Sequence, residues 1–451
     1  MKHNNVFLSI ASVLLLIIPK LLSAQAEQLV SGPMVGYAEM REVQLWVQTK
    51  KTDTVKISYW KKGSVEKKFS EDFITDKNKA YSTKITITGL KPGNRYNYEL
   101  YINNVPVKRD YLLEFQSTPY WTNEAETQAP NFRMVLGSCF NRNYEGSQSP
   151  KKTYGSIEIF DSIYTKHPDF MLWMGDNLYL SAREWNSKSG IDELYTFYRS
   201  TPELQKLFGS VHHYAGIDDH DYGPNNADGT FWNKETTEEA FRYFWSNPNY
   251  GVASALGKGA TGTFVWGDAQ FFLLDDRYFR TPLGSTFENP GMLGKEQIDW
   301  LIGALKMSDA NFKLVMVGTQ VLNPSPAKDL YSNYPEERAA LLQRIKDEKI
   351  EGVIFLSGDI HYTEMTKLDR PGDYPLYELT SSSLTSTSKA EPMKNPLRVD
   401  GTLLMGHSFA TIDFIGEPTE RKMLITIFDD KGIKIWDKII SRSDLSLLNK
   451  K

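Results

Sequence analysis

Five short apolar segments of the sequence are each followed by residues of kinds that bind metals or act in catalysis. The segments are residues 134–136, 170–174, 215–217, 271–274 and 353–356, and the residues after them include Cys139, Asp176, Asp218, Asp219, His220, Asp221, Asp275, Asp276, Arg277, Asp359 and His361. Apolar runs of this length predict buried strands. In an open sheet of such strands, the functional crevice lies at their carboxyl ends. The five endings are therefore expected to converge on one site.

Helical periodicity separates these runs. Ile298, Leu301, Ile302 and Leu305 have the spacing of one buried helix face. Thr236-Thr237-Glu238-Glu239 has the pattern of a capping box, which predicts the start of another helix. Strands that alternate with helices indicate an α/β domain, which we expect at residues 131–445.

Residues 28–118 have a different pattern. Val43, Leu45 and Val47 recur at every second position, as half-buried strands require. Residues 90–96 resemble the part of a fibronectin type III domain where a turn leads into a strand with a corner tyrosine, here Tyr96. These features predict a fibronectin III-like β-sandwich, joined to the α/β domain by a linker at residues 119–130.

Residues 1–26 have the three parts of a secretory signal peptide. Lys2 precedes an apolar run at residues 6–18, and Ala24-Gln25-Ala26 is a cleavage signal. The run is too short to span a bilayer. We therefore expect an exported protein, periplasmic or extracellular, with no stable membrane span; a retained membrane anchor is the alternative.

The composition narrows the class of protein. Hydrophobic residues make up 40% and charged residues 24%, which is typical of a globular chain and excludes disorder and fibres. There are 52 Lys and Arg against 56 Asp and Glu, a net charge of −4, and no long basic run. This balance argues against electrostatic binding of nucleic acid.

Cys139 is the only cysteine, so no intramolecular disulfide can form. In an oxidising compartment an unpaired thiol becomes oxidised unless it is buried or bound to a metal. Cys139 is therefore either a buried inert residue or a metal ligand.

The spacing of the other candidates favours metal binding. Asp176 and Tyr179 are three residues apart, so one tight turn can direct both at the same ion. Asp359 and His361 are two apart and point the same way in an extended segment. A carboxylate, a phenolate, an imidazole and a thiolate suit a divalent or trivalent transition metal beside a second, carboxylate-bound ion. Two adjacent metals are a known arrangement for in-line displacement at phosphorus.

Three motifs together resemble the alkaline phosphatase D family of exported metallophosphatases, in the calcineurin-like and purple acid phosphatase group. They are Gly175-Asp176-x-x-Tyr179, Asp218-Asp219-His220-Asp221-Tyr222-Gly223 and Gly358-Asp359-x-His361. The resemblance implies an α/β/β/α metallophosphatase domain and hydrolysis of small-molecule or polymer phosphate esters. A metal-activated oxide or hydroxide is expected to attack phosphorus in line.

The same resemblance implies a role for each site residue. Fe(III) is expected to be held by Cys139, Asp176, Tyr179 and His361, and Ca(II) by Asp176, Asp219 and Asp359, with Asp221 and Asn226 as less certain supports. Asp359 stands where purple acid phosphatases have histidine, which favours calcium over zinc. Arg277 is expected to clamp the phosphoryl oxygens through its planar guanidinium, and His220 to protonate the leaving alcohol.

Structural alternatives exist for several of these residues. Asp219 and Asp221 are also typical loop caps, Tyr179 is also a typical core residue, and Arg277 has Asp275 and Asp276 beside it as structural partners. The alternative functions are a phosphodiesterase or phospholipase on the same scaffold and, less favoured, an exported binding protein without catalysis. The Ser/Thr-rich residues 380–388 are expected to form a loop.

Overall fold

The computed structural model describes residues 28–122, 128–143, 154–327, 329–387 and 391–447. The expected signal peptide at residues 1–26 and part of the expected linker, residues 123–127, lie outside this range. No helix in the described part of the chain has the length and apolar character needed to cross a membrane.

The N-terminal strands form two antiparallel sheets. One has the order β1-β2-β6 and the other β4-β3-β7-β8, with β5 paired to β3 and β9 to β7. The strands are β1 (Leu29–Ala38), β2 (Val43–Thr49), β3 (Thr54–Lys61), β4 (Lys68–Phe69), β5 (Phe73–Ile74), β6 (Ser82–Ile87), β7 (Arg95–Ile102), β8 (Val105–Val107) and β9 (Glu114–Gln116). The alternating apolar residues of β7 are buried because one face of this strand packs on the core. The expectation of a half-buried strand is wrong for β2, because Trp46 and Gln48 on its other face are buried too.

Two larger sheets follow in the chain. The six-stranded sheet has the order β12-β11-β10-β20-β21-β22 and the seven-stranded sheet the order β13-β14-β15-β16-β18-β17-β19. Their strands are β10 (Phe132–Gly137), β11 (Phe170–Met174), β12 (His212–Gly216), β13 (Gly262–Trp266), β14 (Ala269–Leu273), β15 (Phe312–Met316), β16 (Val353–Ser357), β17 (Tyr362–Leu368), β18 (Leu376–Thr380), β19 (Leu404–Met405), β20 (Ser408–Ile415), β21 (Lys422–Asp429) and β22 (Lys434–Ser441).

The middle strands of both sheets form parallel runs and are almost completely buried. β10, β11 and β12 run parallel, as do β14, β15, β16 and β18. Every residue of β11 and β16 is buried, which explains why these strands are continuous apolar runs in the sequence. Aromatic side chains join the two sheets: the rings of Tyr214 and Phe264 stack with centroids 3.7 Å apart.

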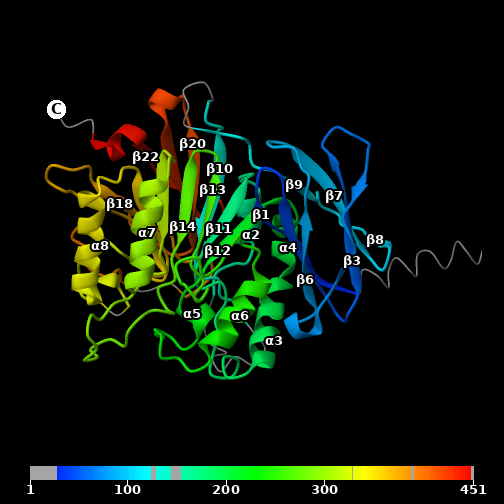
Figure 1. Cartoon of the computed structure of the whole chain (residues 1–451), viewed down its shortest axis with the longest axis horizontal. Coiled ribbons are helices and arrows are strands. Elements are labelled where there is room, and N and C mark those ends of the chain that lie inside the picture. The colour runs from blue at the N-terminus through cyan, green and yellow to red at the C-terminus, as the bar shows by residue number, and fades with distance from the viewer. Residues whose placement is uncertain (1–27, 123–127, 144–153, 328, 388–390, 448–451) are drawn as a thin grey trace, which may run out of the picture.

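Helices lie on both sides of this pair of sheets. Figure 1 shows α7 and α8 at the end far from the N-terminal strands, and α3, α4 and α6 between the larger sheets and those strands. The helices are α2 (Ile159–Tyr164), α3 (Lys188–Arg199), α4 (Pro202–Ser210), α5 (Asp219–Tyr222), α6 (Lys234–Phe244), α7 (Lys295–Met307) and α8 (Pro335–Asp347). Short 3-10 helices are η1 (Lys77–Lys79), η2 (Tyr331–Asn333), η3 (Pro418–Glu420) and η4 (Arg442–Leu445).

The predicted capping box is wrong. Helix α6 begins at Lys234 after Asn233, so Thr236 and Thr237 lie inside its first turn and cap nothing. Thr236 Oγ1 donates to Asn233 Oδ1 at 2.7 Å. The chain before α6 is fixed instead by Asn233 Nδ2, which donates to the carbonyl of Trp185 at 2.7 Å. A tertiary contact therefore sets the helix start here, where the local pattern indicated a later one.

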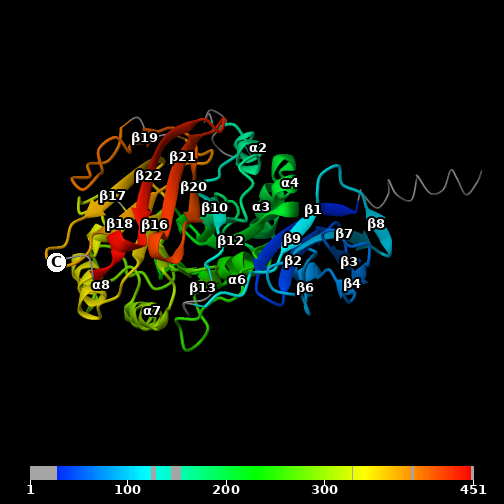
Figure 2. The ribbon, with the colours of Figure 1, turned by 90° about the horizontal axis from the view of Figure 1, so that it is seen from above.

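The N-terminal sheets pack directly against the six-stranded sheet, on the side where Figure 2 shows the blue strands. His212 of β12 lies in this contact: its Nδ1 donates to the carbonyl of Gly36 at 2.7 Å, and its Nε2 accepts from the backbone N–H of Gln116 at 3.0 Å. Trp46 Nε1 donates to the carbonyl of Tyr243 at 2.9 Å. These buried polar contacts give the two parts of the chain one defined relative position.

Candidate metal centre

Segments that follow four buried strands meet at one edge of the paired sheets. Cys139 comes two residues after β10, Asp176 two residues after β11, and Asp359 two residues after β16, while Asp219 opens α5 three residues after β12. Because these strands are parallel to their neighbours within each sheet, their carboxyl ends lie on the same side.

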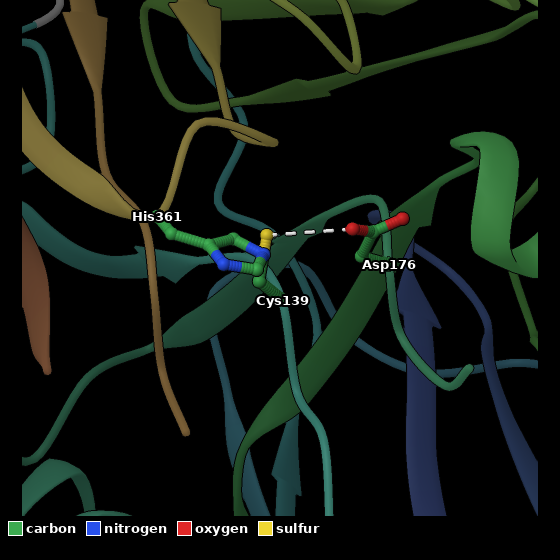
Figure 3. Close-up of side chains that lie close together, drawn as sticks. All are labelled: Cys139, Asp176 and His361. Carbon is green, nitrogen blue, oxygen red and sulfur yellow. Dashed lines mark hydrogen bonds between the residues drawn. The ribbon is translucent and has the colours of Figure 1, made fainter. Parts of the chain in front are cut away.

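The first group of potential ligands comprises Cys139, Asp176 and His361, with one ligand atom of each lying within 4.8 Å of the others. Cys139 Sγ lies 3.5 Å from Asp176 Oδ2, and Figure 3 shows the sulfur between this carboxylate and the ring of His361. Tyr179 joins the group: its hydroxyl lies 3.1 Å from Asp176 Oδ2 and 3.2 Å from His361 Nε2. The structure thus brings together the four residues expected to hold the transition metal.

Two further groups share Asp176. One consists of Asp176, Asp219 and His220 and the other of Asp176, Asp218 and Asp359, again with ligand atoms within 4.8 Å of one another. Asp176 is the residue common to all three groups. This is the position that a carboxylate bridging two ions requires.

The site has a closed and an open side. Cys139, Asp176 and Asp219 are buried, whereas Tyr179, His220, Asp359 and His361 are partly exposed. A ligand from solvent therefore meets the phenol, the two imidazoles and the Asp359 carboxylate first.

Strained backbone marks the same residues. Cys139 has φ of 59°, Asp176 52°, Asp359 64° and His361 60°, all in the left-handed region that side chains with a Cβ rarely adopt. Such conformations typically cost 1–3 kcal/mol each and cluster at functional sites. Here they turn the chain sharply after each strand and direct the side chains toward one point.

Burial and like charges oppose ionisation of the ligands. Burial raises the pKa of Asp176 well above its usual range, and the neighbouring Cys139, Asp219 and Asp359 raise this pKa further. Burial also raises the pKa of the Cys139 thiol and, together with Asp176, the pKa of Tyr179. Each of these groups becomes easier to ionise beside a cation.

The residues fit cations in chemistry as well as in charge. Sulfur, phenol and imidazole on one side of Asp176 match a transition metal, and the carboxylates on its other side match a hard cation. Asp218 Oδ2 is buried without a hydrogen-bond partner in the described structure. A bound cation compensates buried oxygens of this kind.

His220 is positioned as a free imidazole at the open side. Its backbone N–H donates to Asp176 Oδ1 at 3.3 Å and to Asp219 Oδ1 at 3.0 Å, which fixes the main chain. Its ring lies on that of Tyr179 with centroids 4.1 Å apart, and its Nδ1 has no hydrogen-bond partner among the described residues. Burial lowers the pKa of His220, although Asp219 acts to raise it.

Arg277 lies in a buried ion-pair network that includes Asp218, a member of one ligand group. Its side chain is 0% exposed, its Nε donates to Asp218 Oδ1 at 2.7 Å, and its terminal nitrogens donate to Asp329 at 3.1 and 2.5 Å. Asp276 Oδ1 lies 3.5 Å from Nε. These contacts favour the structural alternative for Arg277. Of the two aspartates beside it in the sequence, Asp276 makes the ion pair, and the closer partners Asp218 and Asp329 come from distant segments.

The two less certain calcium supports differ from the main ligands. Asp221 Oδ1 accepts from the backbone N–H of Asn177 at 3.0 Å and its Oδ2 from that of Asp218 at 3.1 Å. Both oxygens are thus used in backbone hydrogen bonds, and Asp221 belongs to none of the three groups. Burial raises its pKa to about 8. Asn226 reaches the site through its backbone N–H, which donates to Asp219 Oδ2 at 2.6 Å, while its side-chain oxygen accepts from Asn225.

Sequence reasoning assigned no role to two residues that organise this site, Asp218 and Asp329. Asp218 caps the N-terminus of α5 and also binds Arg277. It fits because Gly175 and Gly318 leave room: a Cβ at these positions would lie 2.4 Å from Asp218 Cβ and 2.6 Å from its Cγ. Asp329 lies in a loop after β15 with no pattern in the sequence that connects it to Arg277.

Two sequence families match the chain. The sequence model of the family described as PhoD-like phosphatase matches residues 134–406, and the model of a domain of unknown function (DUF7800) matches residues 26–119. Alkaline phosphatase D of Bacillus subtilis (strain 168) is 22% identical over 355 residues, which make up 68% of this chain and 56% of that protein. The match thus spans little more than half of that relative.

A solved structure described as that of PhoD shares the fold. It has a TM-score of 0.73 and covers 92% of this chain and 89% of its own, at 15% sequence identity. At this identity the likeness concerns the fold alone. The family model, however, covers more than half of the chain, including every residue of the three ligand groups. The chain belongs to the PhoD-like phosphatase family.

Proposed function

We propose that this protein is a metal-dependent phosphoester hydrolase. The observation that carries the proposal is the position of Asp176, which lies within ligand distance of a sulfur and imidazole group on one side and of carboxylates on the other. When bound, adjacent cations at such a site lower the pKa of water and neutralise charge on a phosphoryl group. Family membership supports phosphoester hydrolysis over other uses of two cations.

We propose Fe(III) and Ca(II) as the metals. Cys139, Tyr179 and His361 with Asp176 provide one sulfur, one nitrogen and oxygen donors, which suit iron better than calcium. Asp176, Asp219 and Asp359 provide only oxygen, which suits calcium. Asp221 is better placed to hold the turn at α5 than to bind an ion directly, because both its oxygens accept backbone N–H groups.

The chain's own residues divide the remaining work. His220 is partly exposed at the open side, so its imidazole can give a proton to a departing alkoxide, although the unpartnered Nδ1 is itself buried. Burial lowers the pKa of His220 and so disfavours the protonated ring, while Asp219 acts to raise this pKa. Arg277, the expected clamp of phosphoryl oxygens, instead holds Asp218 and Asp329, so its proposed contribution is to keep the α5 turn in place.

The substrate is proposed to be a small-molecule or polymer phosphate ester met outside the cytoplasm. The signal-like residues 1–26 support export, and the test is the N-terminal sequence of the mature protein, which should begin after Ala26. A chain from the cell that still begins at Met1 would contradict export by this signal.

The finer description of the fold is also a proposal. The two packed sheets with helices on both sides support an α/β/β/α metallophosphatase domain at residues 131–445. The two N-terminal antiparallel sheets support a fibronectin III-like sandwich at residues 28–118.

The experiment that tests the proposed function is elemental analysis with parallel kinetics on p-nitrophenyl phosphate and bis-p-nitrophenyl phosphate. Iron and calcium should be present, chelation should abolish hydrolysis, and the two metals together should restore it. The ratio of the two rates separates a phosphatase from a phosphodiesterase or phospholipase. Full activity in protein shown to be free of metal would overturn the proposal.

A further inference from the structure

The Ser/Thr-rich segment, expected only to be a loop, lies between the two chain segments that carry Cys139 and His361. The backbone N–H groups of Leu384 and Ser386 donate to the carbonyls of Ser138 and Cys139 at 2.8 and 3.0 Å. On the other side, the N–H of Ser381 donates to the carbonyl of Ser357 at 3.0 Å. Serines 381, 382, 383 and 386 are all buried. Buried hydroxyl groups usually have hydrogen-bond partners, and for Ser382 and Ser383 these partners lie on the ligand segments.

Ser382 contacts both ligands with one hydroxyl group. Its Oγ donates to Cys139 Sγ at 3.1 Å and accepts from the backbone N–H of His361 at 3.1 Å. A hydroxyl has one proton to donate and two lone pairs that accept, so Ser382 can make both hydrogen bonds at the same time. The Ser382 side chain thus links Cys139 to His361, and its hydrogen bond to sulfur is stronger when the sulfur is an electron-rich thiolate.

A second contact orients the imidazole. His361 Nδ1 lies 2.7 Å from the carbonyl oxygen of Thr387, so this nitrogen carries the proton and Nε2 is the acceptor nitrogen of the ring. A metal-bound histidine typically donates its other N–H to a carbonyl or carboxylate in this way. Nε2 is also the atom that faces Tyr179, inside the ligand group.

We propose that residues 381–387 form the outer layer of the metal centre and that Ser382 is a positioning residue that controls the electron density of the Cys139 thiolate. The inference rests on the proposed function, since it takes Cys139 as a ligand. A hydrogen bond to a coordinated sulfur withdraws electron density from it, and such bonds tune the electronic properties of metal–thiolate sites. Without the Ser382 hydroxyl, the sulfur gives its electrons to the metal more readily.

The molecule provides two matched controls for Ser382. Ser138 Oγ is 3.5 Å from the same sulfur, but it donates its proton to the carbonyl of Ser381 at 3.1 Å. Ser381 is equally buried, and its hydroxyl has no hydrogen-bond partner among the described residues. Replacing Ser381 removes a buried hydroxyl near the site without touching the sulfur, whereas replacing Ser138 removes the longer contact to the same sulfur.

The test is the thiolate-to-cobalt charge-transfer band of the full mature chain loaded with Co(II). Ser382→Ala should move this band to longer wavelength, because a more electron-rich sulfur is oxidised by light of lower energy. Ser381→Ala should leave the band where it is in the parent, and Ser138→Ala should move it less than Ser382→Ala does. Co(II) affinity of Ser382→Ala, from competition with a chelator, should fall about 10-fold or more, the scale found for partners of metal ligands.

Each outcome decides one question. An unshifted band in Ser382→Ala, or an equal shift in all three variants, would overturn the role of Ser382. If the parent itself shows no thiolate-to-cobalt band, then Cys139 is not a ligand and the proposed metal centre fails as well. If Ser382→Ala does not fold, the cobalt–sulfur stretching frequency of the parent loaded in D₂O and in H₂O decides instead: a shift is expected, and identical frequencies would contradict the hydrogen bond.

Discussion

The N-terminal sheets and the strand-end site bury polar groups in opposite ways. Over residues 28–118, all of which are described, the buried charged residue is Asp53, and Asn103 Nδ2 donates to it at 2.8 Å. The site buries several carboxylates side by side, among them Asp176, Asp218 and Asp219. The first is a single carboxylate, with one oxygen bonded to Asn103 and the other without a hydrogen-bond partner among the described residues, whereas the second places several like charges together and is costly unless cations compensate it.

The difference teaches where function is built into this chain. The polar contacts of residues 28–118 hold the sheets in shape. Tyr96 is another example, because its hydroxyl accepts from the backbone N–H of Lys91 at 3.0 Å. Grouping like charges on strained backbone lowers stability in return for a defined binding site. Variants of the two regions should therefore respond in opposite ways to metal and to pH.

The largest effect is expected at Asp176. Asp176→Asn removes the ligand common to all three groups, so metal content and activity should fall together, the latter by about 10³-fold or more, on the scale of losing a main electrostatic stabiliser. In metal-free protein the same variant should melt no lower than the parent, because Asn resembles the protonated carboxyl that burial favours. Asp110→Asn, at an exposed position, is the matched control. Retention of metal by Asp176→Asn would break the assignment.

Arg277→Ala should act on stability first. It leaves Asp218 and Asp276 without their cation and Asp329 with Arg280 alone, and breaking a buried ion pair from one side typically costs about 3–5 kcal/mol. Thermal unfolding and kinetics are measured on the same sample, with Arg277→Lys beside it. A normal melting temperature with kcat lowered about 10²–10³-fold would support the clamp that the sequence predicted and exclude the structural role.

His212 makes the contact between the two regions sensitive to acid. Burial lowers its pKa from 6.5 to about 4. The contribution of His212 to the free energy of unfolding is therefore complete above pH 6.5, where the ring is neutral in the folded and in the unfolded state. It decreases as the pH falls toward 4, because there only the unfolded chain takes up the proton. The loss amounts to about 3 kcal/mol.

His212→Gln should flatten the decrease in unfolding free energy between pH 6.5 and 4, measured by denaturant titration. The neighbouring His213, whose pKa burial lowers to about 3, contributes to the slope that remains. An unchanged slope in the variant would show that His212 is not buried neutral in the contact.

The smallest effect is expected at Tyr96. Tyr96→Phe removes the hydroxyl that accepts from Lys91, which should lower the free energy of unfolding by about 1 kcal/mol. Turnover per folded molecule should not change, because Tyr96 belongs to the scaffold. A large fall in turnover with intact folding would mean that the N-terminal sheets help to form the site.

Much of the site was visible in the sequence because strand ends converge by topology. Cys139, Asp176, Asp219, Asp359 and His361 could be named together, since each follows an apolar run and such runs form parallel buried strands. Their grouping needed no knowledge of distant contacts. The periodicity of α7 could also be predicted, because it depends only on local spacing. Its four apolar residues are all buried: Ile298, Leu301, Ile302 and Leu305.

What could not be predicted depends on contacts between distant segments. Asp329 reaches Arg277 across 52 residues, and Ser382 reaches Cys139 across 243. No local pattern encodes such pairs, so the family resemblance predicted Arg277 to clamp phosphoryl oxygens, and residues 380–388 were expected only to form a loop. The start of α6 was misplaced for the same reason, because a contact with Trp185 overrides the local capping pattern.

The central claim, that cations compensate the carboxylates buried at the strand ends, is tested most directly by thermal unfolding of chelated and metal-loaded protein from pH 5 to pH 8. Burial raises the pKa of Asp176 well above its usual range, so without metal its contribution to stability is present at low pH and is lost as the pH rises through its folded pKa. Bound cations remove this loss. The melting temperatures of the two forms should therefore diverge as the pH increases, with the metal-loaded form higher. Coincident curves over the whole range would contradict the account.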